Sequence, residues 1–286
     1  IIQMYKYLKI LISKFYLVLA RKFHNSNLSS NSSSIYLENF INYLRGITVR
    51  FYYNKENKFF LAIEGKNKLK FTNKIRGIEL YRNGILKRAE FIFSSYCLGK
   101  ITFSDDDIII DCGANFGDLK FKLSNFIKSE NYIGIEPNPS DFETLKFNTG
   151  NRTKLINKAL GNINGNLPFY LSTDEGDSSI IEPSQYTEII NVPVIRLDKL
   201  IDELNIDKIK LLKIEAEGYE PEVLEGLGDK MRICQYIAVD GGYERGVKLE
   251  QTLTTITNHL LNNGFEMIDI YFPWCRALFI NKKQNF

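Results

Sequence analysis

The chain has 286 residues, enough for one core domain of about 200 residues and a smaller appendage. Lysine and arginine total 37 against 34 for aspartate and glutamate, and there is no long basic run or repeated aromatic platform, so we do not expect nucleic acid as a partner. The four cysteines lie far apart with no C-x-x-C pair and only two histidines, which favours a reducing compartment and argues against structural zinc.

Residues 1–22 predict an amphipathic helix. Its basic sector carries Lys6, Lys9, Lys14 and Arg21, and its apolar face carries Met4, Leu8, Leu11, Phe15 and Leu19. A membrane span needs about 20 largely uncharged residues, and no such run is present here. Two alternatives stay open: the helix packs on the domain or on a second copy, or it makes peripheral contact with a membrane. We therefore expect a cytoplasmic protein, with contact at the inner membrane face as the alternative.

The remaining chain divides into two parts after a polar stretch. Residues 1–34 are interpreted as the amphipathic helix and a flexible linker, because 24–34 are rich in serine and asparagine. Residues 35–100 are interpreted as an α+β cap preceding a cofactor domain at 101–286. Within the cap we expect a helix at 36–44, strands at 49–53, 59–64 and 69–71, and a long helix at 78–98.

The stretch 107–117 organises the predicted cofactor domain. Its β-branched run is apolar on both faces, as expected of a central parallel strand covered by helices. The strand ends near Asp111, and Gly113 permits a tight turn in which no Cβ blocks a ligand. Gly117 lets a helix at 118–127 start close to the sheet, and Ala114 and Asn115 lie in the loop between.

A second strand, 131–136, ends on Glu136, nineteen residues beyond Gly117. An acid at the tip of the second strand of a βαβ unit is placed to bind the hydroxyls of a ribose, so a nucleoside cofactor is implied. A dinucleotide site requires G-x-G-x-x-G, but Asn115 stands where the second glycine should be. The acid-x-G-x-x-x-G pattern resembles the S-adenosylmethionine motif, and an NAD-dependent dehydrogenase is disfavoured.

The next elements flank the predicted cofactor site. Pro137 stops the strand, and Ser140 with Glu143 resembles a capping box for a helix to Asn148. A third, outer strand at 155–160 would end beside the adenine. Its residues 157–160 either edge that ring or only close the sheet. Further on, we expect strands at 167–171 and 192–195, and the loop 173–179 is either a mobile lid or plain surface.

A second chemical cluster follows the strand predicted at 209–214. Glu215, Glu217 and Glu220 stand within six residues at its tip, and Asp240 ends a further strand at 236–240. Ligands in parallel sheets bind beyond the carboxyl ends of the strands, so these carboxylates are candidates for a substrate site. The alternative is a solvated acidic turn.

Taken together, these motifs resemble the FkbM family of S-adenosylmethionine-dependent methyltransferases over roughly residues 100–282. The resemblance rests on the segments 111–117, 134–137, 159–161, 178–179, 197–198 and 211–220. It implies a Rossmann-like, seven-stranded, mostly parallel α/β sheet with helices on both faces and an antiparallel last strand. It also implies O-methylation of a hydroxyl on a sugar, glycan, glycolipid or secondary metabolite. One departure is Glu215, where the family usually has aspartate.

The motifs and the chemistry of methyl transfer suggest roles for the candidate residues. The cofactor set is Asp111, Gly113, Ala114, Asn115, Gly117, Glu136, Pro137, Asn157, Ala159 and Leu160. Glu217 or Glu215 is the favoured base for the acceptor hydroxyl, with Glu220 and Asp240 as hydrogen-bonding groups. Helix capping or a salt bridge with Lys213 remains an alternative for each. So do a metal-assisted variant, in which Glu215 and Asp240 hold Mg²⁺, and a noncatalytic S-adenosylmethionine-binding protein.

Overall fold

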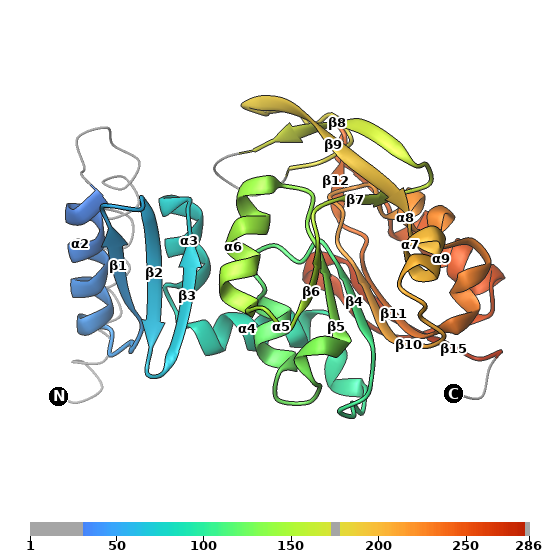
Figure 1. The fold of residues 1–286 in the computed structure, drawn as a ribbon, viewed down its shortest axis with the longest axis horizontal. Helices are drawn as coiled ribbons and strands as arrows, with labels where there is room; N and C mark the ends of the chain where they lie inside the picture. Colours follow the sequence, from blue (N-terminus) through green and yellow to red (C-terminus); the bar gives the residue numbers. More distant parts are fainter. Residues whose placement is uncertain (1–30, 173–177, 284–286) are drawn as a thin grey trace. The chain divides into compact units, whose positions relative to one another are not determined.

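A computed structural model of the chain describes residues 31–172 and 178–283 and contains two compact units, residues up to Ala89 and residues from Glu90 (Figure 1). The division falls inside the single helix predicted at 78–98. Two helices are present instead, α3 (Lys74–Tyr81) and α4 (Ile85–Ser95). Gly84 between them has a φ of +118°, which a helix cannot accommodate, so the Asn83-Gly84 pair breaks the predicted helix.

The first unit packs α2 (Asn31–Leu44) on an antiparallel sheet of β1 (Arg50–Asn54), β2 (Phe59–Glu64) and β3 (Asn67–Phe71). The last four residues of the predicted linker therefore belong to a helix, which corrects its boundary. The core of this unit is aromatic, with the Phe60 and Phe71 rings stacked at 5.5 Å between centroids. The predicted helix at 1–22 lies outside the described residues. No helix among the residues described is long and apolar enough to cross a membrane.

The second unit is built on a seven-stranded sheet, and the predicted Rossmann-like, mostly parallel α/β fold is confirmed (Figure 1). The strand order is β14-β15-β11-β10-β4-β5-β6, and β15 alone runs antiparallel to its neighbours. The strands are β4 (Ile109–Cys112), β5 (Tyr132–Ile135), β6 (Lys154–Ile156), β10 (Ile209–Ile214), β11 (Cys234–Asp240), β14 (Phe265–Tyr271) and β15 (Arg276–Asn281).

Helices cover both faces of this sheet. Successive residues of a strand point to opposite faces, so each central strand contributes to two cores. Ile110 packs into one core with residues of α7, α8 and α9, whereas its neighbour Ile109 packs into the other with residues of α4 and α5. These helices are α5 (Asp118–Leu123), α7 (Leu197–Glu203), α8 (Glu220–Leu227) and α9 (Leu253–Asn262). The central strands are therefore buried on both sides, as their apolar runs predict.

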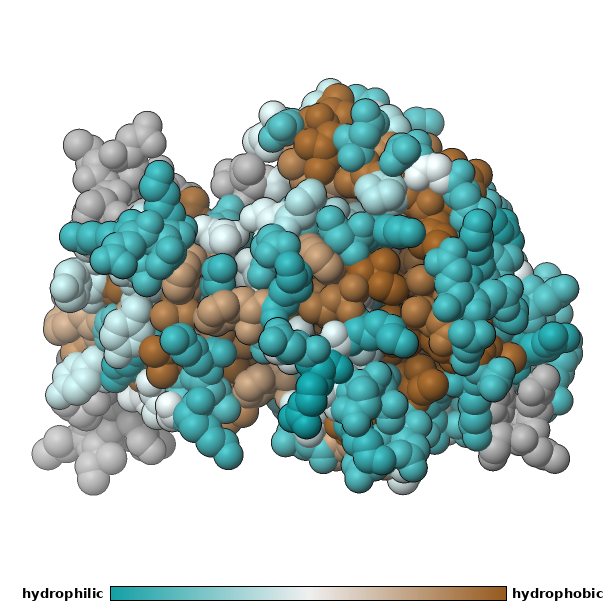
Figure 2. Space-filling model, in the orientation of Figure 1, coloured by the Kyte–Doolittle hydropathy of each residue, from teal (hydrophilic) through white to brown (hydrophobic). Residues whose placement is uncertain are grey.

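The strand predicted at 155–160 is wrong as a single element. β6 ends at Ile156, and β7 (Ala159–Gly161) joins a separate sheet with β9 (Glu188–Arg196) and β8 (Gly165–Leu171). Two residues lie between the strands, and this short gap redirects the chain from one sheet to the other. Figure 2 shows hydrophobic surface over β8 and β9, where Ile189 is half exposed.

The helix after β5 also differs at its start. In α6 (Pro139–Thr149) the N-cap is Asn138, whose side chain accepts a hydrogen bond from the Ser140 backbone N–H at 3.0 Å. The predicted capping box at Ser140 is therefore wrong. Proline at the first helical position fits this arrangement, because its missing N–H would have no partner there.

Candidate active site

The loop after β4 is anchored to the end of β5. The backbone N–H groups of Gly113 and Ala114 both donate to the Ile135 carbonyl at 3.0 Å. Asn115 has a φ of +49° and Gly117 a φ of +92°. Asparagine tolerates this left-handed conformation better than most residues, which explains how it stands where a second glycine would be expected. The loop is thus a defined turn at the carboxyl edge of the sheet.

Glu136 follows β5 directly, at the strand tip where the sequence predicts it, and it lies between two loops. Its Oε2 accepts from the Asn115 N–H and its Oε1 from the Asn138 N–H, both at 2.9 Å. The residue is only 6% exposed. Two backbone donors from different loops fix the orientation of this carboxylate, and such a fixed orientation suits recognition of a pair of ribose hydroxyls.

A polar atom beside Glu136 lacks a partner. The side-chain oxygen of Asn115 is buried and accepts no hydrogen bond from the described residues. Buried polar atoms are normally satisfied by protein, water or ligand. The loop therefore has a place for a hydrogen-bond donor, which an adenosyl cofactor with an amino-acid tail would provide. The residues present fit that group.

Gly113 is required for a reason other than the predicted one. A Cβ on this residue would lie 2.1 Å from the backbone oxygen of Glu215, so glycine lets the loops after β4 and β10 approach each other. This contact shows that Gly113 is needed for packing between two loops, and it does not show the predicted space for a ligand. Gly117 is close to α6, where a Cβ would lie 2.9 Å from the Thr149 side chain, so the close approach at this glycine is to a helix, whereas the sequence predicts one to the sheet.

Gly113→Ala should lower the free energy of unfolding by more than Gly150→Ala. Both glycines have similar φ values, +73° and +78°, but nothing lies within 4 Å of a Cβ at Gly150. The control therefore carries only the left-handed strain of about 1–2 kcal/mol, and Gly113→Ala carries the backbone clash in addition. Equal losses in urea denaturation would show that the loop contact with Glu215 is unimportant.

The predicted adenine-edge residues have other contacts. Asn157 donates from its side chain to the backbone oxygens of Glu136 at 2.8 Å and Pro137 at 3.1 Å, which ties the end of β6 to the tip of β5. Ala159 and Leu160 are buried and pair with β9. Of the two alternatives, the geometry favours closure of a sheet, and contact with adenine stays a prediction.

Lys213 is a buried cation that joins the loops after β4 and β10. Its Nζ lies 3.0 Å from Asp111 Oδ1 and 2.8 Å from Glu215 Oε2, and it donates to the backbone oxygens of Cys112 and Gly113. Burial opposes its charged form, but the two carboxylates outweigh this and raise its pKa. Asp111 is therefore a structural partner of Lys213 and of the Tyr132 hydroxyl, at the base of the cofactor loop.

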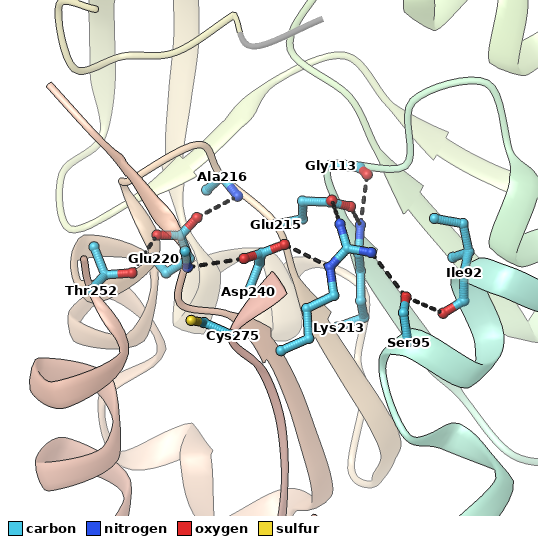
Figure 3. Close-up of polar contacts among 12 residues, drawn as sticks. Ile92, Ser95, Gly113, Lys213, Glu215, Ala216, Glu220, Asp240, Thr252 and Cys275 are labelled. Carbon is cyan, nitrogen blue, oxygen red and sulfur yellow. Dashed lines mark hydrogen bonds and ion pairs between the residues drawn. The ribbon is translucent and has the colours of Figure 1, made fainter. Parts of the chain in front are cut away.

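Arg276 is a second buried cation, which the sequence analysis did not identify. Its guanidinium lies 2.6 Å from both Asp240 and Glu215 and donates to the Ser95 hydroxyl at 2.9 Å. Figure 3 shows Glu215 and Asp240 close together, with Lys213 beside Glu215. Glu215 is thus paired with two cations, which stabilise its ionised form and make it a weak base.

In the metal alternative, Mg²⁺ would bind where the Arg276 guanidinium lies. The Arg276 guanidinium already bridges Glu215 and Asp240, the two carboxylates that the alternative assigns to Mg²⁺. The described part of the chain also contains no group of three or more His, Cys, Asp or Glu residues arranged for a metal. The donor set present therefore does not fit a divalent cation at this position.

Glu220 begins α8 and is almost completely buried. Its carboxylate accepts from the Ala216 backbone N–H at 2.9 Å and from the Thr252 hydroxyl at 3.2 Å (Figure 3). It also accepts from the Gly218 backbone N–H at 3.1 Å. Burial raises the pKa of Glu220 to about 7, although these backbone donors oppose the rise. The contacts support the capping alternative, and the predicted contact with acceptor hydroxyls stays without geometric support.

Glu244 is the titratable residue at this edge that sequence reasoning missed. Burial raises its pKa to about 8, the carboxylates of Asp240, Glu220 and Glu215 add to the rise, and a hydrogen bond with the Glu217 side chain opposes it. Two carboxyl groups that hydrogen bond to each other share a proton. The available signal was an acid four residues after Asp240, beyond two glycines at a strand tip.

Glu217, one of the two predicted bases, is placed by a strained turn. Its φ is +50°, uncommon for a residue with a side chain. Its backbone oxygen accepts a hydrogen bond from the Ser179 hydroxyl at 2.8 Å. Ser179 pairs with Tyr170 of β8, so this contact joins the turn to the sheet of β7, β9 and β8. The structure also brings the Glu217 side chain to Glu244 at the carboxyl edge, where the two are hydrogen bonded.

Comparison with known proteins finds a matching family model and several relatives. Residues 111–270 match the family model described as the methyltransferase FkbM domain. "Hexuronic acid methyltransferase AglP" of Haloferax volcanii is 28% identical over 146 residues, covering 48% of this chain and 56% of that protein. "2-O-methyltransferase NoeI" of Sinorhizobium fredii is 27% identical over 150 residues, covering 46% of this chain and 62% of that protein.

A third relative is more distant in identity. "Methyltransferase 1" of Beauveria bassiana is 25% identical over 163 residues, covering 49% of this chain and 66% of that protein. The chain thus spans less than two thirds of the length of each of these relatives. The family model, by contrast, covers more than half of the chain and contains the β4 loop, Glu136 and the acidic edge. The chain belongs to the FkbM methyltransferase family.

Proposed function

We propose that this protein is an S-adenosylmethionine-dependent O-methyltransferase that acts on a hydroxyl group of a carbohydrate. S-Adenosylmethionine is the cofactor that the family and the fold imply. The observation that carries the proposal is the arrangement along one edge of the sheet. Glu136 follows β5 on the cofactor side, and the Glu217–Glu244 pair follows β10 and β11 on the other side of β4.

The chemistry requires a base at the acceptor. The bound cofactor supplies an electrophilic methyl group, and the acceptor hydroxyl must lose its proton as its oxygen forms the new bond. A base works best when its pKa lies near the working pH. Glu244, with a pKa of about 8, meets this condition, and Glu217 is positioned to share the proton. Glu215 does not meet this condition, because its ion pairs with Lys213 and Arg276 stabilise the ionised carboxylate.

The carbohydrate acceptor is supported by two relatives. One is named for a hexuronic acid and another for 2-O-methylation. A sugar hydroxyl is a weak acid and needs a strong base, in agreement with a carboxyl pair whose pKa is raised.

Glu244→Gln should lower kcat by about 10²- to 10⁴-fold, the usual contribution of a general base, and leave S-adenosylmethionine affinity unchanged. In the wild type, kcat/KM should rise with pH through about 8, because the base of the free enzyme must lose its proton to act. The assay is transfer of labelled methyl groups to a panel of methyl glycosides. Glu143→Gln on α6 is the control, since the Glu143 side chain is 65% exposed and, among the described residues, is paired with Lys146 alone.

Two results would contradict the proposal in different ways. A Glu244→Gln variant with wild-type kcat and an unchanged pH profile would remove Glu244 as the base. Tight S-adenosylmethionine binding without transfer to any hydroxyl compound would instead favour the noncatalytic alternative.

A further inference from the structure

Two aromatic side chains are exposed at the hairpin between β14 and β15. Phe272 is 76% exposed and Trp274 is 49% exposed. In the sheet, Arg276 pairs with Asp240, and the Gly241 N–H donates to the Cys275 oxygen at 3.1 Å. The hairpin tip therefore lies at the carboxyl end of β11, beside the acidic edge of the proposed acceptor site.

The Trp274 ring is held in place although it is exposed. Phe91 contacts it edge to face, with 6.0 Å between centroids and 70° between planes. The Arg276 guanidinium lies 5.0 Å from its centroid, and the same guanidinium is bonded to Asp240 and Glu215. The ring is thus fixed relative to the carboxylates. A fixed, exposed aromatic ring next to polar groups is a typical feature of ligand sites.

The surrounding charges define which ligand would fit. Five carboxylates form a connected group that begins at Asp240, beside the hairpin, and two buried cations lie among them. The carboxylates are those of Glu215, Glu217, Glu220, Asp240 and Glu244, and the cations are Lys213 and Arg276. Carboxylates accept hydrogen bonds from hydroxyl groups and repel anions. A ligand with an apolar face and a rim of neutral hydroxyls satisfies both the ring and the acids.

We propose that Trp274 is the stacking platform for the pyranose ring of a neutral sugar acceptor, with Phe272 extending the same surface. The proposal rests on the proposed function and specifies its acceptor. A pyranose presents C–H groups on its face to the indole and hydroxyls at its edge to the Glu217–Glu244 pair. Uronic acids bind more weakly, because their carboxylate meets the acidic edge.

Trp274 is the single tryptophan of the chain, so its emission reports on this surface directly. Titration of the full chain with neutral methyl pyranosides, excited where tyrosine does not absorb, should give a saturable blue shift. The corresponding methyl uronosides should require at least about tenfold higher concentrations, as expected for at least one unfavourable charge contact. A methylated neutral pyranoside that leaves the emission unchanged, or a uronoside that binds more tightly, would overturn the proposal.

Variants separate the platform from the catalytic step. Trp274→Ala should raise KM for the acceptor about three- to tenfold, the size of an aromatic stacking contribution, with kcat and S-adenosylmethionine affinity unchanged. Trp274→Tyr should restore most of the acceptor affinity, which a merely structural role would not predict. Phe147→Ala on α6, where Phe147 is also 49% exposed, should leave KM unchanged. A Trp274→Ala variant with wild-type KM would contradict the platform.

The two proposals fail separately. If the wild type transfers methyl groups to a sugar without any change in Trp274 emission, the platform is wrong and the methyltransferase function stands. If neutral pyranosides shift the emission but no hydroxyl is methylated, the platform is supported and the proposed function is wrong.

Discussion

Replacing Glu136 with alanine is expected to lower the affinity for S-adenosylmethionine at least about 100-fold. A carboxylate that accepts two ribose hydroxyls makes two charged hydrogen bonds, each worth about 1.5–3 kcal/mol. The substitution also releases the backbone N–H groups of Asn115 and Asn138, which the carboxylate now holds at 2.9 Å. The cofactor therefore loses its two ribose contacts, and the loop after β4 loses the carboxylate that anchors it. Isothermal titration calorimetry measures the change.

Two further variants isolate the cause of that change. Glu136→Gln keeps an oxygen acceptor without the charge, so its affinity should lie between those of the wild type and Glu136→Ala. Glu143→Ala, an exposed acid on the neighbouring helix, should bind as the wild type does. If Glu136→Ala remains folded by circular dichroism and binds with wild-type affinity, Glu136 is not part of the cofactor site.

Lys213→Met is expected to lower the free energy of unfolding by about 3–5 kcal/mol, because removing one partner of a buried ion pair leaves the other charge uncompensated. Asp111 would lose its cation, and Glu215 would keep only Arg276. The carbonyl groups of Cys112 and Gly113 would also lose their shared donor. Guanidinium denaturation near neutral pH measures the loss.

The pH dependence of this variant gives a second test. Burial already raises the pKa of Asp111, with Lys213 opposing the rise, so removing Lys213 raises it further. An acid with a raised pKa in the folded state favours folding at low pH, and this contribution is lost as the pH rises through the folded pKa. The difference in stability between variant and wild type should therefore shrink as the pH falls.

Lys210→Met on the same strand is the matched control for Lys213. Its ammonium group lies over the Tyr236 ring at 5.6 Å, and the side chain is partly exposed. A contact of this kind contributes about 0.5–1 kcal/mol. If the two lysine variants lose the same stability, the buried network around Asp111 does not hold the two loops together.

The sequence predicted the central part of the fold because its signals are local. The β-branched run before Asp111 indicates a strand buried on both faces, and the spacing to Glu136 measures one strand–helix–strand unit. Turn glycines and strand patterns act over a few residues, so they can be interpreted without knowing the rest of the chain. The order of the sheet followed from the resemblance that these motifs carry.

Local signals failed where neighbouring elements decided the outcome. The apolar run at 155–160 is divided between two sheets, since Leu160 pairs with Ile195 of β9, thirty-five residues away. The helix expected at 78–98 ends early at Tyr81, although its Asn-Gly pair was a local signal that we did not use. The division of 155–160 depends on distant contacts that no local pattern records. The end of the helix at Tyr81, by contrast, is indicated by the Asn83-Gly84 pair in the sequence.

The sequence by itself determined that acids stand at the tips of the strands, and it predicted Glu136 as the residue that binds the ribose of a nucleoside cofactor. Only the tertiary structure decided what each acid does. Glu215 is neutralised by Arg276, sixty-one residues away, whereas Glu244 is surrounded by other carboxylates and its pKa rises to about 8. The reason is that a carboxyl group responds to its burial and to the charges packed against it, and those come from segments whose proximity no sequence spacing records.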